Sequence, residues 1–145
     1  MDYRKSVIKN DFKDAVPLIL AVEDDEDNQL LLKSAIAMFG WNSIVVGDGS
    51  NITYLVKNEQ PDLILLDVIL PRFSGLQIAR VLKSNYQTRH IPLIAVTAMS
   101  REKEQQLIFA AGFDKYIRKP YWLENLYQEI VSSLNLIAVC GLPIP

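Results

Sequence analysis

The sequence predicts an α/β fold, a doubly wound parallel sheet in which five strands alternate with five helices in the pattern (βα)5. Two observations carry this prediction: five short apolar runs occur along the chain, and segments with the apolar spacing of helices separate them. Four of the runs are rich in Ile, Leu or Val without alternation, which is typical of strands buried on both faces of a parallel sheet. Strands that alternate with helices favour right-handed crossovers, so helices are expected on both faces.

The elements can be placed in chain order from these runs. The expected strands are residues 17–22, 43–46, 63–66, 93–96 and 115–118, and the last, which is shorter and more polar, is expected at an edge. The expected helices are 30–38, 51–58, 76–83, 101–111 and 122–134, the first of them from the spacing of Leu30, Leu31, Ser34, Ala35 and Met38. Gly40 and Gly112 fall where helices should stop, because glycine readily adopts the left-handed conformation that ends a helix.

A single domain is expected over residues 17–134, with tails at 1–16 and 135–145. The chain has 145 residues, and its 15 Lys+Arg against 17 Asp+Glu give a net charge of −2, so no excess positive charge is available to bind nucleic acid. No apolar run approaches the roughly 20 residues that cross a bilayer, so no membrane partner is expected. The lone Cys140 cannot form an internal disulfide, and the N-terminal stretch is too charged for a signal peptide, so a reducing cytoplasm is expected.

The C-terminal stretch 134–145 has almost no charge. A chain end that stays in solvent is normally polar, so we expect this stretch to dock on protein surface. Packing against a second copy in a homodimer is the favoured arrangement, followed by docking on the domain itself.

Polar residues follow four of the predicted strands. Glu23 and Asp24 follow the first strand, Asp67 the third, Thr97 the fourth and Lys119 the fifth. Because ligands bind beyond the carboxyl ends of the strands in doubly wound sheets, these residues should converge. The acidic residues at 25–27 have a simpler alternative role, since carboxylates are stabilised at a helix N-terminus. Asp67 has no such explanation, because a charge at the end of a buried strand is costly unless it is paired or bound to a metal.

The residue types at these strand ends suit phosphoryl transfer to an aspartate. Glu23, Asp24 and Asp67 provide the oxygen ligands that Mg²⁺ prefers. Lys119 could pair with Asp67 or with a phosphoryl group attached to it, and Thr97 adds a hydroxyl donor. Together they supply a carboxylate nucleophile, a metal that neutralises charge, and donors aimed at the incoming oxygens.

Four motifs give the chain a resemblance to a known family. They are LILAVEDDEDN at 18–28, PDLILLDVILPRFSGLQ at 61–77, IPLIAVTAMS at 91–100 and AGFDKYIRKP at 111–120. In this order and spacing they resemble the receiver domain of two-component response regulators, in particular the single-domain, chemotaxis-regulator-like members. The resemblance covers roughly residues 17–134 and implies a flavodoxin-like sheet with strand order 2-1-3-4-5.

The resemblance also implies a role for each site residue. Asp67 would be the phosphoacceptor, Thr97 and Lys119 would contact the phosphoryl group, and Tyr116 would be the aromatic residue that reorients together with Thr97. The implied Mg²⁺ ligands are Glu23, Asp24, Asp67 and the backbone carbonyl of Ile69. Glu23 stands where an aspartate is commoner in the family, so its side chain is longer than usual at this position. The peptide bond between Lys119 and Pro120 would be cis.

The implied function is a phosphorylation-controlled switch that receives a phosphoryl group from a histidine kinase or phosphotransfer protein, not a conventional enzyme. The downstream partner would bind the face formed by residues 101–111, 115–118 and 122–134. Alternatives are a fragment of a larger regulator or hybrid kinase and a scaffold that is not phosphorylated. A phosphohydrolase of the haloacid-dehalogenase type would need a second acid two residues after Asp67, where Ile69 stands. A nucleotide or flavin binder would need a glycine-rich first loop, and this chain has five consecutive acids there.

Four aromatic residues, Phe39, Trp41, Phe109 and Phe113, are expected to pack in the core or at helix ends. Gly75 is expected to supply a turn conformation that a Cβ would hinder. His90 is expected in an exposed loop.

Overall fold

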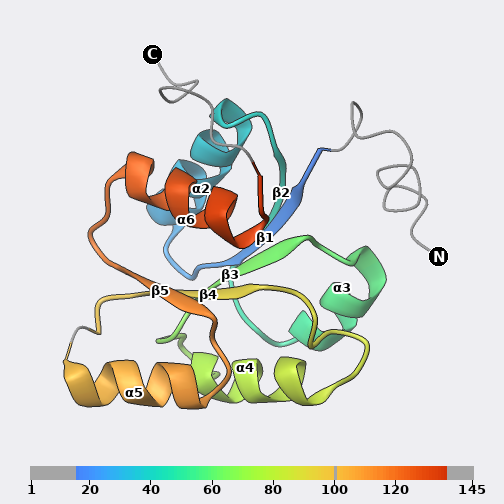
Figure 1. The fold of residues 1–145 in the computed structure, drawn as a ribbon, viewed down its shortest axis with the longest axis vertical. Helices are drawn as coiled ribbons and strands as arrows, with labels where there is room; N and C mark the ends of the chain where they lie inside the picture. Colours follow the sequence, from blue (N-terminus) through green and yellow to red (C-terminus); the bar gives the residue numbers. More distant parts are fainter. Residues whose placement is uncertain (1–15, 100, 137–145) are drawn as a thin grey trace.

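The computed structural model describes residues 16–99 and 101–136, and these form a parallel sheet covered by helices on both faces (Figure 1). The strands are β1 Leu18–Val22, β2 Asn42–Val46, β3 Leu63–Asp67, β4 Leu93–Thr97 and β5 Lys115–Arg118. The helices are α2 Glu26–Met38, α3 Ile52–Glu59, α4 Gly75–Ser84, α5 Glu102–Ala110 and α6 Leu123–Ser133. The strand order β2-β1-β3-β4-β5, with every neighbouring pair parallel, confirms the predicted fold and order.

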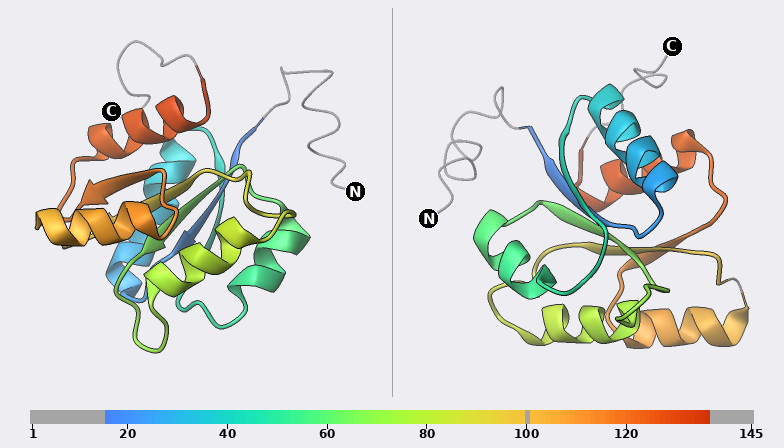
Figure 2. Two further views of the ribbon diagram at one scale, coloured as in Figure 1. Left: turned by 60° about the horizontal axis from the view of Figure 1, so that its bottom comes forward. Right: turned by 180° about the vertical axis from the view of Figure 1, so that it is seen from behind.

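Two hydrophobic clusters hold the layers together. Along β1, Ile19 and Ala21 pack into a cluster with α2 and α6, whereas Leu20 and Val22 point to the opposite face and join a cluster with α3, α4 and α5. Figure 2 shows the same division, with α2 and α6 on one side of the sheet and the other three helices on the other. Successive side chains of a strand point to opposite faces, so every side chain of a central strand covered on both faces is buried.

The edge strand β2 differs from the prediction that the first four strands are buried on both faces. Asn42 is exposed, and the rest of β2, including Ile44 and Val46, is only half-buried. The reason is its position, since β2 pairs with β1 alone and its outer edge is not covered by another strand of the described sheet. An apolar run therefore predicted a strand here without predicting how deeply that strand is buried.

The apolar face of the first helix is also different from the predicted one. Of the predicted positions only Ala35 is buried, while Leu30 is 65% and Met38 39% exposed. The buried side chains are Leu32 and Ile36 together with Ala35. The face that packs on the sheet is thus rotated by about one residue, roughly 100° around the helix axis, from the predicted face.

The other local predictions have mixed outcomes. Phe39 and Phe113 are buried, and Trp41 stacks on Tyr127 just after α2, as predicted. Phe109 is 48% exposed in the last turn of α5, where its ring meets Tyr116, so it packs at a helix end and not in the core. His90 is exposed as expected. Gly40 (φ 90°) and Gly112 (φ 111°) follow helix ends in the left-handed region. Gly75 opens α4 with no positive φ, and it is needed for space: a Cβ would lie 2.6 Å from the Cα of Val68.

At the amino-terminal edge of the sheet, two aspartates hold the starts of strands. Asp62 Oδ2 accepts a hydrogen bond from the backbone N–H of Leu18 at 2.8 Å, and Asp114 Oδ2 accepts one from the N–H of Leu93 at the same distance. Lys83 on α4 adds an ion pair to Asp114 at 3.0 Å. The contacts to Asp62 and Asp114 satisfy the backbone N–H groups of the first residues of β1 and β4.

Within the described ranges no helix is long and apolar enough to cross a membrane. The predicted docking of the C-terminal stretch falls mostly on residues 137–145, which lie outside the described residues, and so does nearly all of the expected N-terminal tail. Self-association therefore stays a prediction.

Candidate functional site

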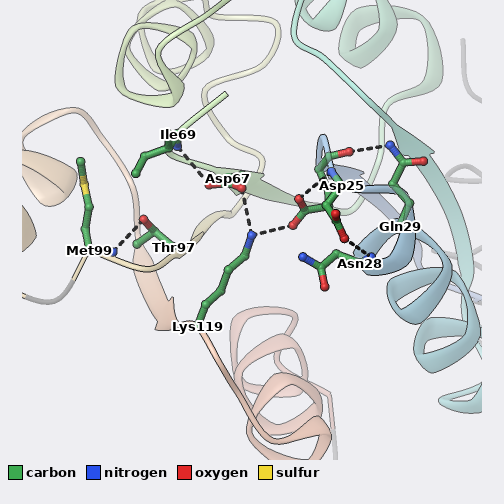
Figure 3. A network of polar contacts seen from close by, with 9 residues as sticks. Asp25, Asn28, Gln29, Asp67, Ile69, Thr97, Met99 and Lys119 are labelled. Atoms are coloured by element: carbon green, nitrogen blue, oxygen red, sulfur yellow. Dashed lines mark hydrogen bonds and ion pairs between the residues drawn. The ribbon is translucent and has the colours of Figure 1, made fainter. Parts of the chain in front are cut away.

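The carboxyl ends of four strands bring the predicted polar residues to one edge of the sheet, and Figure 3 shows Asp67, Thr97 and Lys119 there. Glu23 directly follows β1, Asp67 ends β3, Thr97 ends β4, and Lys119 directly follows β5. Glu23, Asp67 and Thr97 are all buried. The chain thus places two carboxylates and a hydroxyl beneath the surface at this edge, where their charges and dipoles are poorly screened by water.

Lys119 bridges the two buried carboxylates. Its Nζ donates to Glu23 Oε1 at 2.7 Å and to Asp67 Oδ2 at 2.9 Å. The remaining oxygens are also occupied, because Glu23 Oε2 accepts from the backbone N–H of Asp25 at 3.1 Å and Asp67 Oδ1 accepts from the N–H of Ile69 at 3.0 Å. Pairing with Asp67 was predicted, whereas the contact with Glu23 was not.

The electrostatics of Lys119 follow from this bridge. Partial burial lowers its pKa, but the hydrogen bonds and the negative charges of Glu23 and Asp67 outweigh burial, so the pKa of Lys119 is raised above its ordinary value. The ammonium group therefore stays charged across the physiological pH range. The bond between Lys119 and Pro120 is cis, as the resemblance implies.

Asp24 completes a group of carboxylates that could hold a cation. One oxygen from each of Glu23, Asp24 and Asp67 lies within 4.8 Å of the others, and Asp24 is exposed whereas the other two are buried. This donor set consists only of oxygens, as a hard divalent cation such as Mg²⁺ requires, and its single exposed member leaves room for metal-bound water. The three carboxylates carry more negative charge than Lys119 alone can balance.

The loops beside the carboxylates are held by the first turn of α2 and the start of α4. Asp25 caps α2 by accepting from the N–H of Asn28 at 2.9 Å, which supports the simpler interpretation of the acidic residues at 25–27. Gln29 donates to the carbonyl of Glu23 at 2.7 Å, a contact that the sequence analysis did not foresee. Ile69 is 57% exposed and pairs with Ser74 in an isolated antiparallel bridge.

Thr97 and Tyr116 lie on neighbouring strands, β4 and β5. Thr97 is fully buried, and its Oγ1 accepts from the backbone N–H of Met99 at 3.1 Å. Tyr116 is half-buried, and its hydroxyl accepts from Gln105 Nε2 at 2.6 Å. The predicted pair is thus present on one side of the site, but each member has its own hydrogen-bond partner in this structure.

Comparison with known proteins shows which family the chain resembles. A family model described as the response regulator receiver domain matches residues 19–131. The polar-differentiation response regulator DivK of Brucella anthropi is 36% identical over 117 residues, which cover 81% of this chain and 95% of DivK.

Solved structures show the same fold. The receiver domain of a sensor histidine kinase from Pseudomonas aeruginosa PAO1, with a magnesium ion coordinated in its active site cleft, is 26% identical, has a TM-score of 0.77 and covers 83% of this chain and 99% of its own. The chemotaxis protein CheY4 of Vibrio cholerae, at 21% identity, shares the fold with a TM-score of 0.78 over 83% of this chain and 100% of its own. Because the family model and DivK both match most of the chain, the protein belongs to the response regulator receiver domain family.

Proposed function

We propose that this receiver domain is a phosphorylation-controlled switch in which Asp67 accepts a phosphoryl group from a histidine kinase or phosphotransfer protein. The observation that carries the proposal is the buried Asp67 carboxylate, held by Lys119 within one cluster with Glu23 and Asp24. Even a paired carboxylate is costly to bury, because the loss of its hydration can exceed the attraction of its partner, so stability alone does not account for Asp67. In the transfer, an Asp67 oxygen bonds to phosphorus as the bond from phosphorus to the donor histidine nitrogen breaks, and the histidine leaves with its electron pair.

The surrounding residues have distinct roles in this proposal. Glu23, Asp24, Asp67 and the carbonyl of Ile69 would hold Mg²⁺, which when bound neutralises charge on the phosphoryl oxygens. Lys119 already contacts Asp67 Oδ2 and would pair with the new phosphoryl group. The closeness of the carboxylate oxygens of Glu23, Asp24 and Asp67 to one another supports the metal assignment.

Thr97 and Tyr116 would convert phosphorylation into a change of surface. A charge-assisted hydrogen bond contributes roughly 1.5–3 kcal/mol, whereas moving an equilibrium from 1:99 to 99:1 requires about 5.5 kcal/mol. The Thr97 hydroxyl alone is therefore insufficient, and the pairing of Lys119 with the phosphoryl group must contribute the rest.

The partner surface in this proposal is the face of α5, β5 and α6. A pocket of about 410 Å³ lies between β5 and α6 on this face, lined among others by Tyr116, Arg118 and Trp122. Trp122 is 79% exposed, and large exposed aromatic side chains are enriched at protein interfaces. In this proposal the switch is a single domain of residues 17–134 that works in the cytoplasm. The proposal also includes a homodimer that forms through the C-terminal stretch 134–145.

Mass spectrometry after incubation with acetyl phosphate and Mg²⁺ tests the proposal. The parent should gain the mass of one phosphoryl group, and Asp67→Asn should gain none. Asp27→Asn, which removes an exposed carboxylate from the first turn of α2, is the matched control and should label like the parent. Equal labelling of Asp67→Asn would refute the assignment, and a parent that never labels would favour the scaffold alternative.

A further inference from the structure

Tyr116 is held by two residues of α5. Gln105 Nε2 donates to its hydroxyl at 2.6 Å, and the ring of Phe109 meets the tyrosine ring edge-on, with centroids 6.2 Å apart. Gln105 and Phe109 are four residues apart and so lie on the same side of the helix. The helix thus contacts both the polar tip and the ring of Tyr116.

The register of the sheet places this contact on the face that carries Thr97. Tyr116 pairs with Ala95 across β4 and β5, and Thr97 lies two residues beyond Ala95 on the same strand. Because side chains two apart in a strand point the same way, Tyr116 and Thr97 belong to one face of the sheet. Ala95 and Ile108 of α5 share one hydrophobic cluster, so this is also the face that α5 covers.

We propose that Gln105 is a positioning residue that holds Tyr116 in its resting position against α5 and so sets the threshold of the switch. The inference rests on the proposed role of Tyr116 as the residue that moves on phosphorylation. Any movement of the tyrosine tip away from α5 breaks its hydrogen bond to Gln105. Gln105 therefore opposes the movement, and phosphorylation must outweigh it.

The size of the effect follows from the worth of one hydrogen bond. A hydrogen bond between neutral groups that is partly exposed to water changes an equilibrium by about two- to tenfold. Removing it should shift the ratio of the two Tyr116 positions by that factor before any phosphorylation occurs. Less phosphorylation would then be needed to complete the change.

Fluorine NMR on protein labelled with 3-fluorotyrosine tests this, with the Tyr116 resonance assigned by its loss in Tyr116→Phe. In the unphosphorylated Gln105→Leu variant we expect a two- to tenfold shift of the ring population toward the position found after treatment with acetyl phosphate and Mg²⁺. Gln106→Leu is the matched control, since Gln106 is the next residue of α5 and is exposed. Gln105→Glu should restore the parent population, because the phenol can donate to the new carboxylate.

The inference is wrong if the Tyr116 population in Gln105→Leu matches that in Gln106→Leu. Should Gln105→Leu fold poorly, a double-mutant cycle of Gln105→Ala and Tyr116→Phe, measured by urea unfolding, replaces the NMR experiment. A two- to tenfold coupling between the two changes in the unfolding equilibrium would support the contact, whereas additive effects would overturn the inference. The failure of this inference and the failure of the proposed function can be told apart. If acetyl phosphate does not label the protein but Gln105 and Tyr116 are coupled in the unphosphorylated state, the contact stands and the phosphorylation proposal fails.

Discussion

An Asp–Lys pair lies at the carboxyl ends of the strands and another at the amino ends, and the two pairs differ in their burial and their surroundings. At the carboxyl edge Lys119 contacts Asp67 at 2.9 Å, and at the amino edge Lys83 contacts Asp114 at 3.0 Å. The distances are nearly the same, but the Asp67 side chain is 8% exposed whereas the Asp114 side chain is 49% exposed. Residue type and distance alone therefore do not distinguish the pair in the proposed site from a pair that only stabilises the fold.

The surroundings distinguish them. Asp114 and Lys83 are satisfied by the backbone, since Asp114 also accepts from the N–H of Leu93 and Lys83 also donates to the carbonyl of Ile91 at 2.9 Å. Their charges balance one to one. Lys119 instead faces the carboxylates of three residues, Glu23, Asp24 and Asp67. Charge balance is the difference between them: an excess of buried negative charge favours binding of a cation, whereas the balanced pair at the amino edge leaves no net charge to attract one.

Removing Lys119 should have the largest effect on stability. Lys119→Met leaves Glu23 and Asp67 buried without their cation, and the loss of one partner from a buried pair is strongly destabilising. Because Lys119 is partly exposed, we expect a smaller effect than for a fully buried pair. The free energy of unfolding, measured by urea unfolding in EDTA, should fall by about 3 kcal/mol. Saturating Mg²⁺ should restore part of the loss, because a ligand that binds only the folded state stabilises it.

Lys115→Met is the control for this effect. Lys115 on β5 pairs with Glu129 at 3.3 Å near the surface, and such pairs contribute at most about 1 kcal/mol. Lys115→Met should therefore lower the free energy of unfolding only slightly, and Mg²⁺ should not change this effect. An unchanged stability of Lys119→Met in EDTA would mean that the Lys119 bridge does not compensate the buried carboxylates.

Removing the aspartate of the amino-edge pair should have a smaller effect. Asp114→Ala leaves the backbone N–H of buried Leu93 without its acceptor, which costs about 2 kcal/mol. Mg²⁺ should not restore it. Asp114→Asn keeps an acceptor oxygen and should lose about 1 kcal/mol or less; if both variants lost the same amount, the ion pair rather than the N–H contact would be the stabilising interaction.

The sequence predicted most of the fold because parallel-sheet strands leave a strong signal. Each predicted strand agrees with an observed one to within about a residue at either end. The face of α2 could not be predicted, because Leu30, Leu31 and Leu32 are consecutive and each points about 100° from the last. Only the position of the helix on the sheet decides that Leu32 is buried and Leu30 exposed.

The site could be predicted for the same topological reason, since the carboxyl ends of parallel strands converge. The contacts of individual side chains could not. The bond from Lys119 to Glu23 joins residues 96 apart in the chain, and it depends on the length of the Glu23 side chain and on the rotamers of both residues. The bond from Gln105 to Tyr116 likewise requires the packing of α5 on β5, which no local pattern specifies.

Removing the exposed carboxylate of the cluster should have the smallest effect on stability and a clear effect on metal binding. Asp24 is exposed, so Asp24→Asn should change the free energy of unfolding in EDTA by no more than about 0.5 kcal/mol. If Asp24 is a ligand, its loss should weaken Mg²⁺ binding about tenfold or more, measured by calorimetric titration. Asp27→Asn makes the same charge change on the first turn of α2, outside the carboxylate cluster, and should leave the affinity within about twofold of the parent, because exposed charges are screened by water and salt. Equal weakening in both variants would show that the total charge of this edge attracts the cation, and a loss specific to Asp24→Asn would show that Asp24 binds it directly.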